Sequence, residues 1–210
     1  MEMMSRYPDN YFELAIVDPP YGIGFNGHNQ IIGKSGKSRG FNNKKLYNIK
    51  DWDRERPDAD YFSELIRVSK NQIVWGGNYF ADLLSPKKGW IYWDKKPNGE
   101  NLSFSDGELA WTSFDKPLRM YSYGWIGFWM VNSGEKKIHP TQKPIALYKW
   151  LLDNYAKAGD KILDTHLGSG SIAIACHDYG FELTACELDK DYYQSAMKRI
   201  KNHVSQLKLF

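Results

Sequence analysis

The stretch Leu14-Ala15-Ile16-Val17-Asp18-Pro19-Pro20-Tyr21 decides how the fold of this chain is interpreted. Its first four residues form a short apolar run with two β-branched side chains, which predicts a buried strand. The strand has to end at Asp18, because Pro19 and Pro20 cannot donate to a ladder. A carboxylate, two carbonyls and an aromatic ring are therefore expected at the carboxyl end of a strand, where open α/β sheets bind ligands. A plain strand-ending turn has the same composition, so the rest of the chain must decide between the two.

Length and composition limit the class of protein. With 210 residues the chain is large enough for one domain with a full core. Its formal net charge of +3 permits nucleic acid as a partner without arguing for it. Aromatic residues make up 15% of the chain, and planar rings can fill a core or stack on a base. The sequence has no apolar run that could span a membrane and no apolar signal segment, so we expect a cytoplasmic protein without membrane contacts.

Cysteine and histidine spacing does not point to a metal site. Cys176 and Cys186 lie in apolar surroundings, so we expect reduced, buried thiols. The five histidines show no metal-ligand spacing with the cysteines or with one another. The sequence therefore predicts no metal.

A second pattern, near the C-terminus, predicts a nucleotide-binding βαβ unit. Glycines before a helix let the backbone approach a ligand, and an acid after the second strand can accept ribose hydroxyls. In order, the pattern has a strand at Lys161–Leu163, Asp164, a glycine loop at Thr165–Ser171, a helix at Ile172–Tyr179, a strand at Phe181–Cys186, and Glu187.

The place of Asp164 separates two ligands for this unit. The sequence Gly168-Ser169-Gly170-Ser171-Ile172-Ala173 fits a dinucleotide pattern, so a dinucleotide-dependent oxidoreductase remains an alternative. A carboxylate at Asp164 is poorly placed beside a pyrophosphate. It is well placed near a cationic ligand such as S-adenosylmethionine, although a loop-bracing acid would look the same.

The remaining elements follow from hydrophobic periodicity and from turn residues. The first dozen residues resemble the tail of a helix and a turn. Further on we expect a helix from Asp58 to about Lys70, strands at Gln72–Trp75, Trp90–Trp93 and Glu108–Thr112, a short helix at Tyr79–Leu84, one or two strands between Met120 and Val131, a helix from Pro144 closed by Gly159, and a last helix at Lys190–Leu207.

Residues 22–50 form a long glycine-rich, basic stretch with no acid before Asp51. Loops of this length are usually functional or disordered. We expect an arm that contacts phosphates and becomes ordered on nucleic acid, with a merely solvated loop as the alternative. The candidate DNA-binding residues are Lys34, Lys37, Arg39, Lys44 and Lys45.

Three motifs occur in one order along the chain: Asp18-Pro19-Pro20-Tyr21, His139-Pro140-Thr141-Gln142-Lys143-Pro144, and Asp164 with Gly168-Ser169-Gly170. Together they resemble the DNA amino-methyltransferases of the β-class, as found in phages and restriction-modification systems, in which the catalytic motif precedes the cofactor motif. The similarity covers nearly the whole chain. It implies a single α/β domain over residues 1–210 with a Rossmann-like, circularly permuted methyltransferase fold. The sheet would be mostly parallel and seven-stranded, with one antiparallel strand and helices on both faces.

The resemblance also implies roles for individual residues. Asp18 and the Pro19 carbonyl would accept hydrogen bonds from the target amino group, Pro20 would complete the motif, and Tyr21 would stack on the flipped base. Cofactor contacts to S-adenosylmethionine would come from Asp164, Gly168, Ser169, Gly170, Glu187, Thr141, Gln142 and Lys143. Weaker pocket candidates are Asn78, Asp94 and Glu108.

The reaction that the resemblance implies is methylation of adenine N6 in DNA. An exocyclic amine is a poor nucleophile because its lone pair is delocalised, and two acceptors that pull its hydrogens out of plane restore its reactivity. Aspartate at the first motif position favours adenine in this family, whereas serine is commoner for cytosine N4. Cytosine N4, an RNA or protein substrate, and a catalytically impaired DNA-binding remnant remain alternatives. Carbon-5 methylation needs a cysteine near the motif, and neither cysteine is placed there.

The sequence departs from the family pattern in two places. Thr165 and His166 replace the usual Pro-Phe, and we expect the His166 ring to preserve the packing. Family members usually have a strand before the region of Met1–Met4, and we expect this chain to start after it. Residues 112–137 are short for a target-recognition region, so the basic stretch and a homodimer partner are further candidates for that role.

Overall fold

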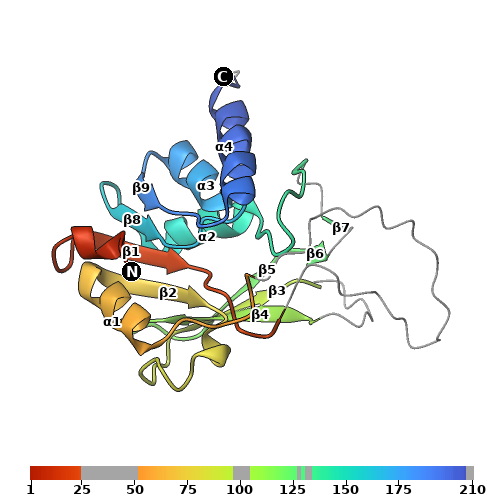
Figure 1. Cartoon of the computed structure of the whole chain (residues 1–210). Helices are drawn as coiled ribbons and strands as arrows, with labels where there is room; N and C mark the ends of the chain where they lie inside the picture. The colour runs from red at the N-terminus through yellow and green to blue at the C-terminus, as the bar shows by residue number, and fades with distance from the viewer. Residues whose placement is uncertain (25–51, 97–104, 127–128, 131–133, 207–210) are drawn as a thin grey trace.

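A seven-stranded sheet forms the centre of the molecule (Figure 1). The computed structural model describes residues 1–24, 52–96, 105–126, 129–130 and 134–206. The strand order is β5-β3-β4-β2-β1-β8-β9. These strands are β1 (Phe12–Val17), β2 (Ser69–Trp75), β3 (Trp90–Asp94), β4 (Gly107–Thr112), β5 (Arg119–Ser122), β8 (Lys161–Asp164) and β9 (Glu182–Ala185), with a separate pair β6 (Trp125–Ile126) and β7 (Trp129–Met130).

One strand of the described sheet runs against the others. β1 pairs in parallel with β2 and with β8, β8 with β9, and β3 with β5. β4 lies between β2 and β3 and is antiparallel to both. The expected mostly parallel sheet with one reversed strand is confirmed.

Helices cover both faces of this sheet, as expected (Figure 1). Along β1, Leu14 and Ile16 point into one core, whereas Ala15 and Val17 point into the other. The apolar run is therefore buried on both sides, as strands of parallel sheets are. The first core includes α2 (Ile145–Tyr155), α3 (Ser171–Tyr179) and α4 (Lys190–Val204), and the second includes α1 (Ala59–Val68).

Several predicted boundaries are wrong. The helix capped by Asp58, whose carboxylate accepts from the backbone N–H of Tyr61 at 3.0 Å, ends at Val68 because the next residues already pair with β1. The helix expected at Tyr79–Leu84 is a 3-10 turn at Gly77–Tyr79. After this turn the N–H groups of Leu83 and Leu84 both donate to the Phe80 carbonyl, at 2.9 and 3.0 Å, so the segment makes a single further turn instead of a helix.

Other boundaries are shifted for local reasons. α2 starts at Ile145 and ends at Tyr155, because Pro144 is its N-cap and Gly159 belongs to the following turn. The aromatic region contains three short strands rather than one or two. The N-terminal segment forms a 3-10 turn at Met4–Arg6 instead of a helix tail, and α4 ends at Val204.

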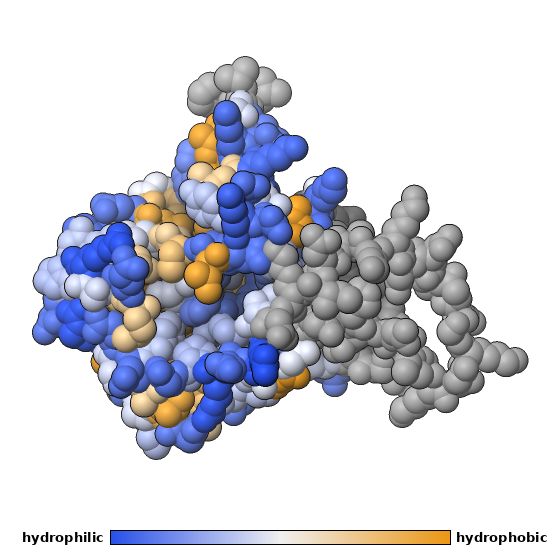
Figure 2. All heavy atoms as spheres, viewed as in Figure 1, coloured by the Kyte–Doolittle hydropathy of each residue, from blue (hydrophilic) through white to orange (hydrophobic). Residues whose placement is uncertain are grey.

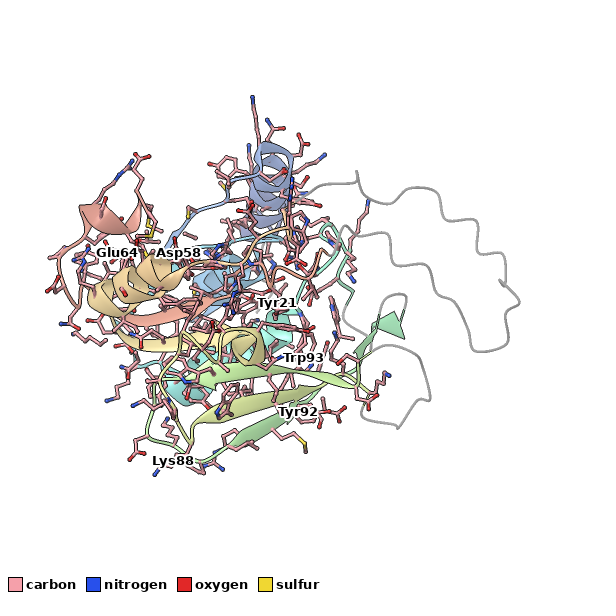
Figure 3. All side chains as sticks on the ribbon, turned by 60° about the horizontal axis from the view of Figure 1, so that its bottom comes forward. Tyr21, Asp58, Glu64, Lys88, Tyr92 and Trp93 are labelled. Atoms are coloured by element: carbon pink, nitrogen blue, oxygen red, sulfur yellow. The ribbon has the colours of Figure 1, made fainter. Side chains whose placement is uncertain are left out.

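The topology brings the candidate residues to one edge of the sheet. Asp164 ends the parallel strand β8, and Asp18 and Glu187 follow the parallel strands β1 and β9. β4 runs the other way and begins at this same edge, where it presents Glu108. In Figure 3, Tyr21 and Trp93 lie toward this end of the molecule, whereas Lys88, before β3, lies at the opposite end.

The surface facing the viewer in Figure 2 is largely hydrophilic, with hydrophobic residues in scattered places. Within the described parts of the chain, none of the helices has the length and apolar character needed to cross a membrane.

Replacing Ile16 with Ala tests the core around β1. This side chain is 1% exposed in an inner strand of the sheet, so its truncation is expected to lower the free energy of unfolding by about 2–5 kcal/mol. Ile66→Ala is the control, because that side chain on α1 is 48% exposed and should cost less than about 1 kcal/mol. Urea unfolding of both variants measures the difference, and equal losses would contradict this fold.

Candidate active site

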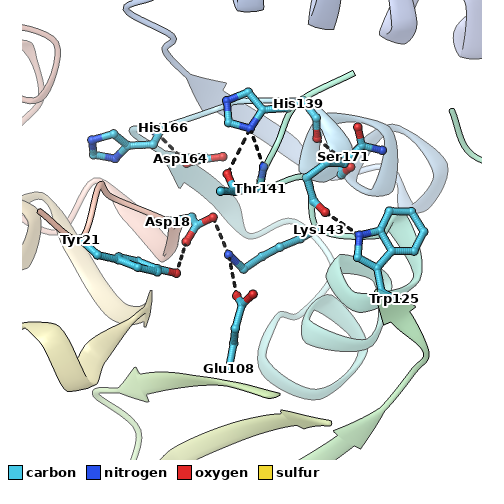
Figure 4. Close-up of polar contacts among 12 residues, drawn as sticks. Asp18, Tyr21, Glu108, Trp125, His139, Thr141, Lys143, Asp164, His166 and Ser171 are labelled. Atoms are coloured by element: carbon cyan, nitrogen blue, oxygen red, sulfur yellow. Dashed lines mark hydrogen bonds and ion pairs between the residues drawn. The ribbon is translucent and has the colours of Figure 1, made fainter. Parts of the chain in front are cut away.

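Asp18 lies at the centre of a partly buried polar cluster (Figure 4). The hydroxyl of Tyr21 donates to its Oδ1 at 2.8 Å. The ammonium of Lys143 donates to its Oδ2 at 2.5 Å from a position 125 residues later in the chain. The structure therefore joins the motif after β1 to the polar turn before α2.

Lys143 is held by charges from two strands. Its side chain is 3% exposed, and besides Asp18 it forms an ion pair with Glu108 Oε2 at 3.2 Å. Its Nζ also lies 5.2 Å from the ring centroid of Trp75. Burial by itself would lower the pKa of Lys143, but the Asp18 and Glu108 carboxylates outweigh it and raise the pKa. The ammonium therefore stays charged.

Glu108 completes the cluster from β4. Its Oε1 accepts from Lys95 at 2.7 Å. Burial acts to raise the pKa of Glu108, but the ammonium groups of Lys143 and Lys95 lower it to about 2. Of the three weaker candidates from the sequence, Glu108 is thus a central charge of the site, whereas Asp94 and Asn78 are not. Asp94 braces a turn by accepting from Lys96 and Ser122, and Asn78 is exposed on the 3-10 turn.

The ring of Tyr21 is fixed by its surroundings. It stacks on Tyr79 with ring centroids 4.8 Å apart, and the edge of Phe80 packs against it. Gly76 has φ +68°, and a Cβ there would come within 2.2 Å of Tyr21 Cε1. Burial and the charge of Asp18 raise the pKa of Tyr21, so its hydroxyl remains a donor.

Asp164 is a buried carboxyl at the end of β8. It is 2% exposed, and its Oδ1 accepts from the backbone N–H of His166 at 2.9 Å. Burial raises the pKa of Asp164 to about 8, and the charges of Asp18 and Glu187 add to this effect. Among the described residues, no cation forms an ion pair with it. An acid in this situation is suited to a cationic ligand.

The glycine loop is tied to Glu187 and to α4. Glu187 accepts from the backbone N–H of Gly168 at 2.8 Å and from that of Asp189 at 2.8 Å. Each carboxylate oxygen keeps a second lone pair for a further donor. The side chain of Ser169 contacts Ser171 Oγ at 3.1 Å and is buried.

Arg199 braces this loop and was not found by sequence reasoning. It donates to the Ser169 carbonyl at 2.9 Å and forms a 2.6 Å ion pair with Glu135. Glu135 in turn accepts from the backbone N–H of Ile145 at 3.0 Å, so it caps α2. The sequence signal available for Arg199 was its place three residues after the buried Ala196 on an amphipathic helix.

In the polar turn before α2, Gln142 and Thr141 make different kinds of contact. Gln142 is 3% exposed. Its side-chain oxygen accepts from the backbone N–H of Ile138 at 2.9 Å, and its backbone carbonyl accepts from the indole N–H of Trp125 at 2.6 Å. The structure thus places Gln142 as a brace of the turn. Thr141 contacts His139 Nδ1 at 3.1 Å, beside the glycine loop.

The departure from the usual Pro-Phe pair is accommodated by α1. The hydroxyl of Tyr61 contacts Thr165 Oγ1 at 2.7 Å, and the rings of Tyr61 and His166 pack edge to face with centroids 5.6 Å apart. Burial lowers the pKa of His166 to about 4, so this ring is neutral and packs like an aromatic residue.

The remaining predicted residues are the two cysteines and the candidate DNA-binding residues. Cys176 in α3 and Cys186 after β9 are free thiols. The expected DNA-binding residues Lys34, Lys37, Arg39, Lys44 and Lys45 lie outside the described residues.

Comparisons with known proteins agree with this arrangement. A family model for N6 and N4 methyltransferases, described as DNA methylase, matches residues 70–198. Type II methyltransferase M.HpaI of Haemophilus parainfluenzae is 34% identical over 65 residues, which are 31% of this chain and 21% of that protein. Type II methyltransferase M2.MboI of Moraxella bovis is 26% identical over 172 residues, 79% of this chain and 56% of that protein. The chain thus spans about half the length of the second relative and less of the first.

A solved structure shows the same fold. The crystal structure of the M1.HpyAVI–SAM complex matches with a TM-score of 0.55 at 20% sequence identity, covering 94% of this chain and 92% of that one. The expected α/β methyltransferase fold is therefore confirmed. Because the family model covers more than half of the sequence, the chain belongs to the N6/N4 family of DNA methylases.

Proposed function

We propose that this chain transfers a methyl group from S-adenosylmethionine to the N6 amino group of adenine in DNA. The observation that carries the proposal is the carboxylate of Asp18, held by Tyr21 and Lys143 at the carboxyl end of β1. Family membership supports DNA as the substrate. We further propose that residues 1–210 act as one methyltransferase domain, with residues 112–137 and the basic stretch contributing to target recognition.

The geometry of Asp18 suits a group that accepts hydrogen bonds from an amine. A carboxylate has about four lone-pair positions, and Tyr21 and Lys143 take two of them. The remaining positions, with the Pro19 carbonyl, can accept the amine hydrogens and turn the nitrogen lone pair toward the methyl carbon. The negative charge of Asp18 also stabilises the positive charge that develops on the attacking nitrogen as the bond from sulfur to the methyl carbon breaks. Tyr21 offers a ring of fixed orientation on which the flipped base can stack.

The cofactor half of the site fits a cation better than a pyrophosphate. S-adenosylmethionine supplies a methyl group on a sulfonium and carries no phosphate. Asp164 would face its positive charge, Glu187 would accept ribose hydroxyls, and Gly168, Gly170 and Ser169 would line it with Thr141 and Lys143. Gly170 has φ +74°, and a Cβ on it would lie 3.0 Å from Ile200 Cδ1, so a side chain there would be strained. A dinucleotide would bring phosphates toward two acids, which disfavours the oxidoreductase alternative.

The identity of the methylated base is the most specific part of the proposal. Aspartate in the first motif position favours adenine N6 by analogy with the family, and cytosine N4 is the second candidate because the family includes both. The residues Lys34, Lys37, Arg39, Lys44 and Lys45 are proposed to contact DNA phosphates. An RNA or protein substrate, or a remnant that binds DNA without turnover, gives different results in the experiment below.

Transfer of labelled methyl from S-adenosylmethionine to unmethylated DNA tests the function. We expect N6-methyladenine when the product nucleosides are identified by mass. Asp18→Ala should reduce the rate by about 100-fold or more, because it removes the acceptor aligned with the amine. N4-methylcytosine would correct the base. Labelling of RNA or protein alone, or salt-sensitive DNA binding without labelling, would contradict the proposal.

The pKa of Asp164 makes cofactor binding pH-dependent. The empty protein keeps this carboxyl protonated below pH about 8, and a bound cation favours the ionised form. Affinity for S-adenosylmethionine is therefore expected to rise from pH 6 to 7.5, by at most about tenfold per pH unit, with release of a proton. The empty protein should lose stability as the pH rises toward 8, because the unfolded chain has already released this proton.

Calorimetric titration in buffers of different ionisation enthalpy measures the proton released on binding. Asp164→Asn is the matched control, since it has nothing to ionise at this position and should show neither the release nor the pH dependence. A wild-type affinity that stays flat across this range would refute the assigned role of Asp164.

A further inference from the structure

The backbone after the two prolines is fastened by one buried carboxylate. Pro19 and Pro20 have no N–H, so the first donors after Asp18 are the N–H groups of Tyr21 and Gly22. Both donate to Asp53 Oδ1, at 2.6 and 3.1 Å. Asp53 is 2% exposed, so this acceptor is shielded from water.

The local conformation suits an anion. Gly22 has φ +71°, in the left-handed region, and consecutive N–H groups in such a turn converge on one point. A Cβ on Gly22 would also lie 3.1 Å from the backbone nitrogen of Arg56. The N–H of Gly24 donates to the carbonyl of Asp53 at 2.9 Å. Asp53 therefore holds the turn with its side chain and its main chain.

Tyr21 is consequently fixed at both ends. Its backbone nitrogen is bonded to Asp53, and its phenolic oxygen to Asp18. The segment that contains Asp53 also holds Tyr79, on whose ring Tyr21 stacks. Arg56 donates to the backbone carbonyl of Tyr79 at 2.7 Å, and its two terminal guanidinium nitrogens pair with the carboxylate of Asp82. Two points of attachment leave the aromatic ring little freedom.

We propose that Asp53 is a positioning residue that presets the Tyr21 ring for the target base. This inference rests on the proposed function, in which the Tyr21 ring stacks on the target base. In this role Asp53 acts through its hydrogen bonds to the backbone of Tyr21 and Gly22. A ring held in place before the base arrives costs less ordering on binding, and a displacement of about 1 Å can cost about a hundredfold in rate.

Asp53→Leu, Asp53→Asn and a control variant test this role. Asp160→Leu is the control, because Asp160 also accepts a backbone N–H, that of Lys157 at 2.8 Å, in the turn before β8 at the far end of the sheet. We expect Asp53→Leu to lower kcat on DNA by about 10- to 100-fold. Its Kd for S-adenosylmethionine should stay within twofold of wild type. Asp53→Asn, which keeps an acceptor oxygen, should lose less, and Asp160→Leu should keep the wild-type kcat.

A second readout separates this inference from the proposed function. The amide proton resonances of Tyr21 and Gly22 in the NMR spectrum should lie downfield in the wild type and move upfield in both Asp53 variants, whether or not the protein methylates DNA. A wild type without methylation but with these shifts would refute the proposed function alone. If Asp53→Leu does not fold, Asp53→Asn carries the test through its kcat and its two amide shifts. Wild-type kcat in the folded Asp53 variants, or amide resonances that do not move, would overturn the positioning role.

Discussion

The buried ion pair between Lys143 and Asp18 is the interaction on which the rest of the site depends. It joins two segments that are 125 residues apart in the sequence and places the carboxylate at the edge where β1 ends. Removing one partner from a buried pair leaves an uncompensated charge, so each member enforces the other's position. Glu108 adds a second anion from the reversed strand β4, which explains how a lysine with a 3% exposed side chain remains charged. The mixed topology is thus part of the chemistry, since a parallel β4 would begin at the other edge.

A second network gives the neighbouring glycine loop its shape. Arg199 reaches from α4 to the carbonyl of Ser169 and to Glu135, and Glu135 caps the helix that follows Lys143. The brace of the loop and the position of the lysine are therefore linked through one buried carboxylate. The two halves of the site differ in electrostatics. Asp18 is compensated by the ammonium of Lys143, whereas Asp164 has a raised pKa and no ion-pair partner among the described residues.

The sequence predicts the parts of this structure that depend on local rules. Two prolines end β1, Asp58 caps α1, and glycines open α3, because each effect acts within a few residues. The site is predicted less well, since the contacts that shape it join residues that are far apart in the sequence. No local pattern shows that Glu108 compensates Lys143 or that Asp53 holds Tyr21, 32 residues away. The short helix expected after Gly77 was wrong, since the segment forms a 3-10 turn followed by one turn closed on the Phe80 carbonyl.

The most direct test of this account is a double-mutant cycle between Asp18→Asn and Lys143→Met, measured as free energies of unfolding in urea. Lys143→Met leaves Asp18 without its cation, and Asp18→Asn leaves Lys143 with Glu108 alone, whereas the double change removes both charges of the pair. The account predicts that the double variant loses at least about 1 kcal/mol less than the sum of the two single losses. Losses that add to within about 0.5 kcal/mol would mean that the two residues do not depend on each other, and would contradict the central place given to their ion pair.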